Sequence, residues 1–102
     1  MRVIAVGTLK AFWEKHAQAE QSLRAWYDEA KAANWMTPQD IKDAYASASF
    51  IRNNRVVFNI KGNDYRLVLA VAYRVRVVYI KFVGTHAEYN DVDASSVEMV
   101  SP

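Results

Sequence analysis

The spacing of apolar residues changes about half-way along the chain. In the first half, apolar side chains recur every three or four residues, which is the spacing of a helix with one buried face. Two such runs are present: Leu9, Phe12, Trp13 and His16, and then Leu23, Trp26, Tyr27 and Ala30. They predict amphipathic helical structure, either as one helix or as two with a break at residues 17–19. His16 lies on the apolar stripe and is predicted to be a packed or boundary histidine.

Residues suited to capping mark where these helices begin. A short apolar opening precedes Gly7 and Thr8, which suit a stop and a helix N-cap. Further along, Thr37, Pro38 and Asp40 predict the start of another helix. Threonine caps a first turn, proline fits its first position, and a carboxylate is stabilised near the positive end of the helix dipole.

From Arg55 onward the period is two, which indicates strands. Segments 55–61 and 64–73 flank Gly62-Asn63, a pair suited to a two-residue hairpin turn with positive φ. That turn sets a register in which Asn59 faces Arg66. A second turn, at Arg74-Val75, leads to a third predicted strand over residues 77–83.

The alternation divides the predicted sheet into two faces. The face expected to carry the helices is large and apolar: Val56, Phe58, Ile60, Tyr65, Leu67, Leu69, Val71, Ile80 and Phe82. The face expected to stay open is small and basic: Arg55, Val57, Asn59, Lys61, Arg66, Val68, Ala70, Ala72, Tyr79, Lys81 and Val83. The predicted fold class is therefore α+β, with N-terminal helices packed on one face of a twisted, mainly antiparallel sheet. The strand run is expected to end at Gly84, where the chain turns away.

Charge is segregated along the chain, although the formal net charge is only +2. Residues 1–50 are neutral overall, residues 51–81 carry +6 and residues 82–102 carry −4. A basic segment on one sheet face predicts either a polyanionic partner, most often nucleic acid, or a merely solvated surface. An open face of this kind would admit a phosphate backbone, with Arg55, Asn59 and Lys81 as RNA contacts and Tyr79 stacking on a base.

Length and composition narrow the classes of protein to which the chain could belong. At 102 residues the chain is predicted to be one domain, residues 1–93, with a flexible tail of residues 94–102. The lack of cysteine removes disulfide and thiolate chemistry and favours a cytoplasmic protein, and no apolar window approaches a membrane span. There is no glycine-rich phosphate loop, and the two histidines lie far apart without a carboxylate cluster, so neither a cofactor nor a metal is predicted.

RNA cleavage without a metal is the chemistry that the remaining polar residues suit best. It needs a base for the 2′-hydroxyl proton, cations for the charged phosphorane, and an acid for the leaving oxygen. His86 supplies an imidazole, the side chain most often used for proton transfer, Arg66 presents a planar fork to two phosphate oxygens, and Lys61 adds a point charge. Tyr89 can donate a proton, orient the phosphate or stack on a base.

Four motifs follow one another in the second half: Phe58-Asn59, Gly62-Asn63, Tyr65-Arg66-Leu67, and Thr85-His86 with Glu88-Tyr89. In order and spacing they resemble the HigB-type toxins of bacterial toxin-antitoxin pairs, within the RelE-like mRNA interferase superfamily. The resemblance is strong over residues 35–90 and implies a RelE-like toxin domain over residues 1–93. It further implies an endoribonuclease that cleaves mRNA, commonly on the ribosome, and is silenced by a HigA-type antitoxin with a helix-turn-helix domain.

The site residues carry over one by one. The motif arginine, histidine and tyrosine correspond to Arg66, His86 and Tyr89, and the motif asparagine corresponds to Asn59. The motif does not fix Lys61, Arg55 and Lys81, which are included only because they are predicted to lie on the basic face of the sheet. The chain departs from the resemblance at its end, because related interferases often carry basic residues there and this chain carries Asp91, Asp93 and Glu98. Which of His86, Lys61 and Tyr89 is base and which is acid stays open.

Two alternatives to the toxin remain. A non-catalytic RNA- or DNA-binding module would use the same basic face and would bind with a strong salt dependence. A protein-interaction domain would use that face to dock an acidic partner.

Overall fold

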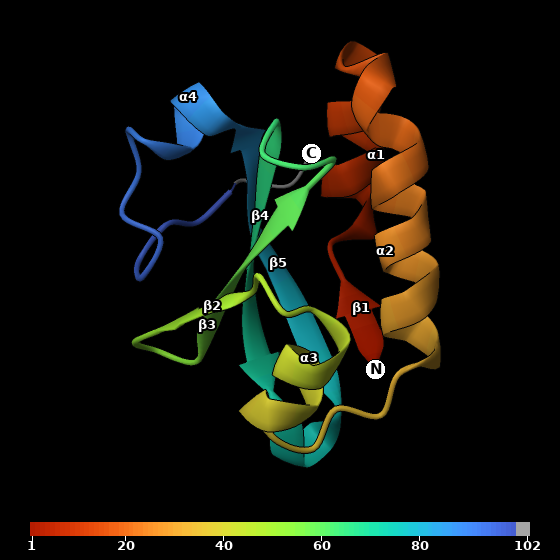
Figure 1. Ribbon diagram of the computed structural model, residues 1–102, viewed down its shortest axis with the longest axis vertical. Coiled ribbons are helices and arrows are strands. Elements are labelled where there is room, and N and C mark those ends of the chain that lie inside the picture. The colour runs from red at the N-terminus through yellow and green to blue at the C-terminus, as the bar shows by residue number, and fades with distance from the viewer. Residues whose placement is uncertain (100–102) are drawn as a thin grey trace.

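The computed structural model describes residues 1–99 and has two layers, helices against a sheet (Figure 1). The elements in chain order are β1 (Arg2–Ile4), α1 (Val6–Lys15), α2 (Glu20–Ala32), α3 (Pro38–Ala44), β2 (Ser49–Ile51), β3 (Arg55–Ile60), β4 (Tyr65–Ala72), β5 (Val77–Thr85) and α4 (His86–Tyr89). Short 3-10 turns occupy Ala17–Ala19 and Tyr73–Val75. The predicted α+β class is confirmed, and the first of these turns shows that the two amphipathic runs form two helices.

The helix starts agree with the sequence in one case and differ in the other. Thr37 caps α3 as predicted, because its Oγ1 accepts from the Asp40 backbone N–H at 3.3 Å while the Asp40 carboxylate accepts from the Thr37 N–H at 3.1 Å. The predicted N-cap of α1 is wrong. That helix begins at Val6 after Ala5, which has a φ of 73°, so Thr8 lies inside the helix and is buried.

Within residues 1–99 the sheet has five strands in the order β1-β5-β4-β3-β2. All neighbouring pairs are antiparallel except β1 with β5, which is parallel. The strand β1 was not predicted, because three residues are too few to show alternation. It nevertheless fixes the fold, since a parallel neighbour requires the chain to cross back over the sheet, and α1 and α2 make that crossing on one face (Figure 1).

The β3–β4 register is confirmed, and the helices cover the predicted face. Asn59 lies opposite Arg66, with Ile60 opposite Tyr65 on one side and Phe58 opposite Leu67 on the other. Positive φ values in the connecting turn fall at Lys61 (52°) and Gly62 (64°), one residue earlier than predicted. The main core then buries the apolar face against the helices, including Leu9, Leu23, Trp26, Ile41, Val56, Phe58, Leu67, Leu69, Val78 and Ile80.

The prediction of which side chains at the end of β5 face the core is wrong, because the alternation shifts by one residue there. Ile80 pairs with Leu69 as a core residue should, but Phe82 pairs with Val68, so Lys81 is an extra residue at a β-bulge. Because side chains alternate, one extra residue exchanges the two faces beyond it. Phe82 therefore lies on the second face, and Val83 belongs to the main core.

Gly84 was predicted to end the strand, but it lies within β5, opposite Arg66, and the strand continues to Thr85. A Cβ placed on Gly84 would lie 2.5 Å from Cζ of Phe82. The glycine is therefore a packing requirement of the bulged strand, since the Phe82 ring folds over it.

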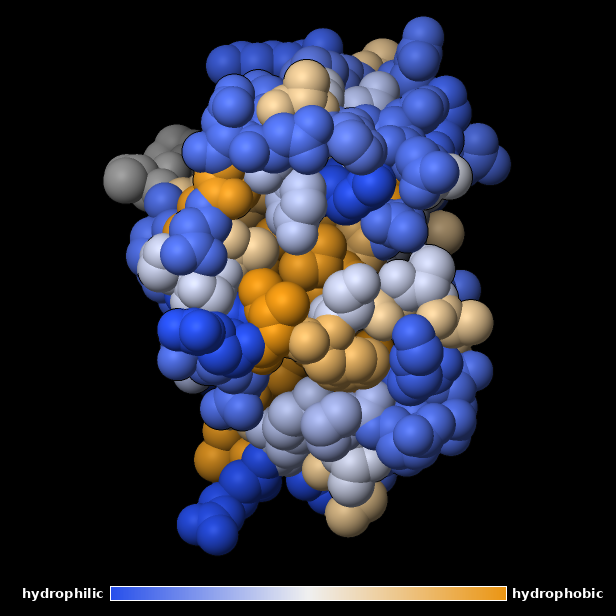
Figure 2. All heavy atoms as spheres, turned by 60° about the vertical axis from the view of Figure 1, so that its left-hand side comes forward, coloured by the Kyte–Doolittle hydropathy of each residue, from blue (hydrophilic) through white to orange (hydrophobic). Residues whose placement is uncertain are grey.

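The second face of the sheet was predicted to be open, and at its centre this is wrong. Val57, Val68 and Phe82 form a second apolar cluster with Ala94, and Val92 and Val97 pack against it. This side of the molecule shows an apolar centre bordered by hydrophilic residues (Figure 2). The physical reason is that β-branched side chains on this face expose enough apolar surface for a following segment to bury.

Residues 94–102 were predicted to be a flexible tail. Residues 94–99 lie against the second sheet face, where Ala94 is 8% exposed, and residues 100–102 lie outside the described part of the chain. The flexibility of the segment stays a prediction.

Candidate active site

Arg66 lies at the end of the sheet where β4 begins and where β3 and β5 end. Its Nη1 donates to the backbone oxygens of Asn63 at 3.1 Å and Tyr65 at 3.3 Å, which holds the guanidinium at the start of β4. The guanidinium carbon lies 5.9 Å from the centre of the Tyr89 ring, within cation–π range. Nε and Nη2 have no hydrogen-bond partner among residues 1–99, so two donors remain for an anion.

His86 and Tyr89 are both placed by the capping of α4. Thr85 Oγ1 accepts from the Glu88 N–H at 3.1 Å, and Glu88 Oε1 accepts from the Thr85 N–H at 2.8 Å, which is a reciprocal capping box. A helix this short gains little from propensity, so the cap supplies most of its local order. Residues three apart in a helix are neighbours, and His86 and Tyr89 therefore share one side of α4.

A backbone hydrogen bond joins α4 to the β3–β4 turn. The His86 N–H donates to the Asp64 carbonyl at 3.0 Å. Lys61, in the same turn, has its Nζ 3.7 Å from Asp64 Oδ2, a weak surface ion pair that leaves the ammonium free to exchange partners. At the other end of the short helix, Asn90 Nδ2 lies 3.4 Å from His86 Nδ1; when it donates there, the neutral ring carries its proton on Nε2.

Five of the eight predicted site residues thus gather at one end of the sheet. Asn59 and Arg66 are cross-strand partners, Arg66 meets Tyr89, and the Lys61 turn contacts His86 through Asp64. Sequence spacing could not show this, because the site depends on how far β5 extends before α4 begins. This end of the sheet therefore carries two cations, an imidazole and a phenol.

The other three predicted residues lie away from this end. Arg55 is only 6% exposed, and its Nη1 donates to the backbone oxygens of Ala94 at 3.2 Å and Val97 at 2.7 Å. Lys81 Nζ lies 2.8 Å from Glu98 Oε1, and the same ammonium lies 5.7 Å from the Tyr79 ring centre. In this conformation Arg55 serves to hold the C-terminal segment.

Glu98 is the acidic partner of both cations. Its Oε2 lies 2.8 Å from Arg55 Nη2, while its Oε1 accepts from Lys81. The hydrogen bond from Lys81, together with the charges of Lys81 and Arg55, lowers the pKa of Glu98 below its ordinary value. The sequence did carry a signal for this contact: the −4 of residues 82–102 directly follows the +6 of residues 51–81.

Sequence reasoning missed the supports of the site. Phe82 and Gly84 set the position of Tyr89, since the Phe82 and Tyr89 ring centres are 6.4 Å apart. Glu88 had no assigned role, although the Thr-x-x-Glu spacing of a capping box was visible in the sequence.

Among residues 1–99 no group of three His, Cys, Asp or Glu side chains is arranged to hold a metal ion. No helix in the same range is both long and apolar enough to cross a membrane.

Comparisons with known proteins agree with this geometry. Residues 19–92 match the model of the HigB toxin family, the RelE-like toxic component of a toxin-antitoxin system. The mRNA interferase toxin HigB of Escherichia coli strain K12 is 29% identical over 92 residues, which cover 88% of each chain. The mRNA interferase HigB of Escherichia coli O6:H1 is 22% identical over 92 residues, covering 88% of this chain and 89% of that protein.

Proposed function

This chain belongs to the HigB family of RelE-like toxins, and we propose that it is an mRNA interferase, a metal-independent endoribonuclease that inhibits translation until an antitoxin neutralises it. The observation that carries the proposal is the contact of Arg66 with Tyr89 where β4 begins beside α4, the short helix that also carries His86. The relatives that carry the name mRNA interferase support the choice of RNA as substrate.

The chemistry we propose is attack by the 2′-oxygen of a nucleotide on its own 3′-phosphate. The new 2′-O–P bond forms as the P–O5′ bond breaks, which yields a 2′,3′-cyclic phosphate and a free 5′-hydroxyl. One proton leaves the 2′-hydroxyl and one is delivered to the 5′-oxygen, with His86, Tyr89 and Lys61 as the three groups available for these transfers. The two uncommitted donors of Arg66 stabilise the charge that develops on the phosphoryl oxygens.

The RNA-binding assignments follow from the same placement. Asn59 lies beside Arg66 and is proposed to contact the nucleotide next to the cleaved bond. Lys81 and Tyr79 are proposed to contact the strand further along, on the face where Glu98 lies, and Arg55 can join them only where residues 94–98 have left that face. Membership of this family of toxin-antitoxin proteins implies that the chain has an antitoxin as its partner. We propose that it is of the HigA type with a helix-turn-helix domain, and that the toxin acts on mRNA at the ribosome in the cytoplasm.

The test uses matched arginine and histidine variants in translating extract. Arg66→Ala and His86→Ala should each lower the rate of message cleavage by about 10²-fold or more, since they remove a charge-assisted contact and a proton-transfer group. Arg74→Ala is the control, because Arg74 is an exposed arginine in the turn before β5, at the opposite end of β4 from Arg66.

Three outcomes separate the functions. Cleavage by wild type and by Arg74→Ala, but not by the two site variants, supports the interferase. Salt-dependent binding of RNA without cleavage, even in the presence of ribosomes, would instead establish a binding module. A folded His86→Ala protein that cuts at the wild-type rate removes His86 from the mechanism.

A further inference from the structure

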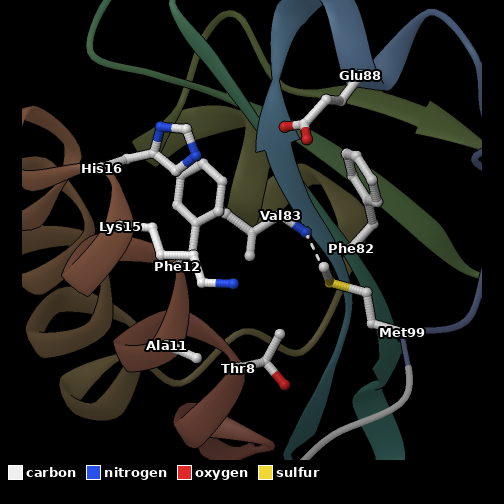
Figure 3. Close-up of a pocket in the computed structure, with 9 residues that line it drawn as sticks. All are labelled: Thr8, Ala11, Phe12, Lys15, His16, Phe82, Val83, Glu88 and Met99. Atoms are coloured by element: carbon white, nitrogen blue, oxygen red, sulfur yellow. Dashed lines mark hydrogen bonds between the residues drawn. The ribbon is translucent and has the colours of Figure 1, made fainter.

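A pocket of about 310 Å³ lies between α1 and the free part of the β5 edge. The strand β1 pairs only with Val77 to Tyr79, so the edge of β5 beyond Tyr79 is not covered by a strand among residues 1–99. Figure 3 shows the His16 ring beside the Phe12 ring, and the Lys15 ammonium and Glu88 carboxylate directed into the space. The pocket is thus walled by aromatic rings and carries charges of both signs.

The polar groups that line this pocket have unused hydrogen-bonding capacity. Neither the Lys15 ammonium nor either ring nitrogen of His16 has a hydrogen-bond partner among residues 1–99. Glu88 uses Oε1 to cap Thr85, while its Oε2 has no partner in the same range. The Lys15 and Glu88 side chains are exposed and His16 is half-buried, so all three polar groups are accessible to a ligand that enters the pocket.

The aromatic wall has the geometry of a stacking surface. The Phe12 and His16 rings are 4.3 Å apart at an interplanar angle of 19°, and the edge of the pair is fixed by Tyr65, whose ring centre lies 6.0 Å from that of His16. His16 is half-buried, as predicted for a packed histidine, and Phe12 is half-buried too, so part of each ring faces the pocket. An unstacked nucleobase binds such rings with little dependence on its sequence context.

The pocket adjoins the candidate active site through one turn of helix. Glu88 lines the pocket, whereas His86 and Tyr89 belong to the site, and all three lie in α4. Phe82 lines the pocket as well and contacts the Tyr89 ring. A strand of RNA whose cleaved phosphate lies at Arg66 would therefore have to pass α4 for its next base to reach the pocket.

We propose that this pocket binds one nucleobase of the mRNA, adjacent to the cleaved phosphodiester. The base lies against the Phe12–His16 pair, and its exocyclic amino group donates to Glu88 Oε2. The Lys15 ammonium approaches the phosphate of that nucleotide. The inference rests on the proposed interferase function and adds a specificity site to it, with single-stranded RNA as the ligand.

A peptide strand added to the β5 edge fits these observations less well. The Val83 N–H donates to the Met99 sulfur at 3.3 Å, and the Thr85 N–H donates to Glu88. Both donors that an added strand would need are therefore already engaged by the chain's own side chains. Strand addition depends on such free edge groups, whereas base stacking does not.

The carboxylate predicts a base preference. Cytosine carries an amino group where uracil carries a carbonyl oxygen, and the two bases are otherwise of the same size. An acceptor-only carboxylate at Oε2 favours cytosine over uracil, since a carbonyl oxygen cannot donate to it. Adenine also has an exocyclic amino group that can meet this acceptor.

The experiment compares variants in translating extract on messages that differ only by cytosine or uracil beside the mapped cut. His16→Ala and Lys15→Gln should raise KM about tenfold with kcat close to wild type, because they remove stacking or charge and leave the reacting groups in place. Glu88→Gln keeps the cap, since glutamine also serves in a capping box, and should bring the cytosine-to-uracil ratio close to one. Lys10→Gln is the control, because Lys10 is exposed on the same helix and does not line the pocket.

The outcomes distinguish this inference from the function on which it rests. Absence of cleavage by the wild-type protein in this extract would contradict both. Wild-type cleavage with all three pocket variants matching Lys10→Gln in KM and base ratio overturns the pocket alone. Loss of antitoxin neutralisation in Lys15→Gln, with an unchanged KM for the message, would show that the pocket binds protein and overturns it too. Thermal melting of each variant shows that the fold is intact.

Discussion

Replacing Gly84 by alanine should damage the site more than it damages the fold. The added Cβ would lie 2.5 Å from Cζ and 3.0 Å from Cε2 of Phe82, whereas ordinary contacts begin at 3.4 Å, so the ring has to move by about 1 Å. The ring is 7% exposed and its nearest aromatic neighbour is Tyr89, the residue that lies against Arg66. The displacement is therefore passed directly to the candidate active site.

The expected cost in stability is moderate. Overpacking a well-filled site costs about 1–3 kcal/mol, and replacing glycine by alanine returns about 0.4–1 kcal/mol by restricting the unfolded chain. The net loss is about 1–2 kcal/mol, which for a domain of this size lowers Tm by roughly 5–15 °C. Thermal and urea unfolding followed by circular dichroism measure it, and message cleavage in translating extract measures the site.

A double-variant cycle tests the reasoning. Phe82→Leu removes Cζ and Cε2, the two ring atoms that the new Cβ would meet, so the double variant should be more stable than the sum of the single losses by about 0.5 kcal/mol or more. Ile41→Val is the stability control, because Ile41 is fully buried in α3 and the change costs about 0.5–1.5 kcal/mol without touching the site. Strictly additive losses, or cleavage by Gly84→Ala at the rate of Ile41→Val, would refute the coupling through Phe82.

Three further changes test other parts of the structure. Leu67→Ala removes a side chain with no exposed surface and should cost about 2–5 kcal/mol in urea unfolding, which a smaller loss would contradict. Thr85→Ala removes the α4 cap and should cost about 1 kcal/mol while lowering cleavage, with Thr37→Ala in α3 as the matched cap control. The pKa of Glu98 is lowered in the folded state, so its contribution is complete above the pKa of the unfolded chain and is lost as pH falls through the folded value. The protection factors of the amides of residues 94–99, corrected for the intrinsic pH dependence of exchange, should therefore fall on acidification, and Glu98→Gln should show low protection factors at all pH values.

What the sequence predicts well is local. The β3–β4 register follows from one short turn and strict alternation, and it was sufficient to set Asn59 opposite Arg66. The α3 cap, which was predicted, likewise depends on residues only three apart. In each case the interacting groups are close in sequence, so the spacing alone determines which groups meet.

What the sequence misses depends on contacts between distant segments. The bulge at Lys81 is decided by the fit of Phe82 over Gly84 and beneath α4, and no alternation pattern within β5 records it. The parallel strand β1 needs the whole α1–α2 crossover before it has a partner. The same bulge carries a functional consequence: it moves Phe82 off the main core and onto the side of Tyr89.

The bulge therefore links the two sites assigned to this protein. If the same strand paired without a bulge, Lys81 would lie opposite Val68, Phe82 would point into the main core, and Tyr89 would lack the ring that contacts it. With it, Phe82 contacts Tyr89 and also lines the pocket beside α1. Deleting Lys81 would keep Ile80 opposite Leu69 and Phe82 opposite Val68 in regular pairing, so Phe82 should still contact Tyr89 and both cleavage and base preference should survive. Loss of both in a folded deletion variant would show that the bulged backbone itself, and not only the side on which Phe82 lies, positions the two sites.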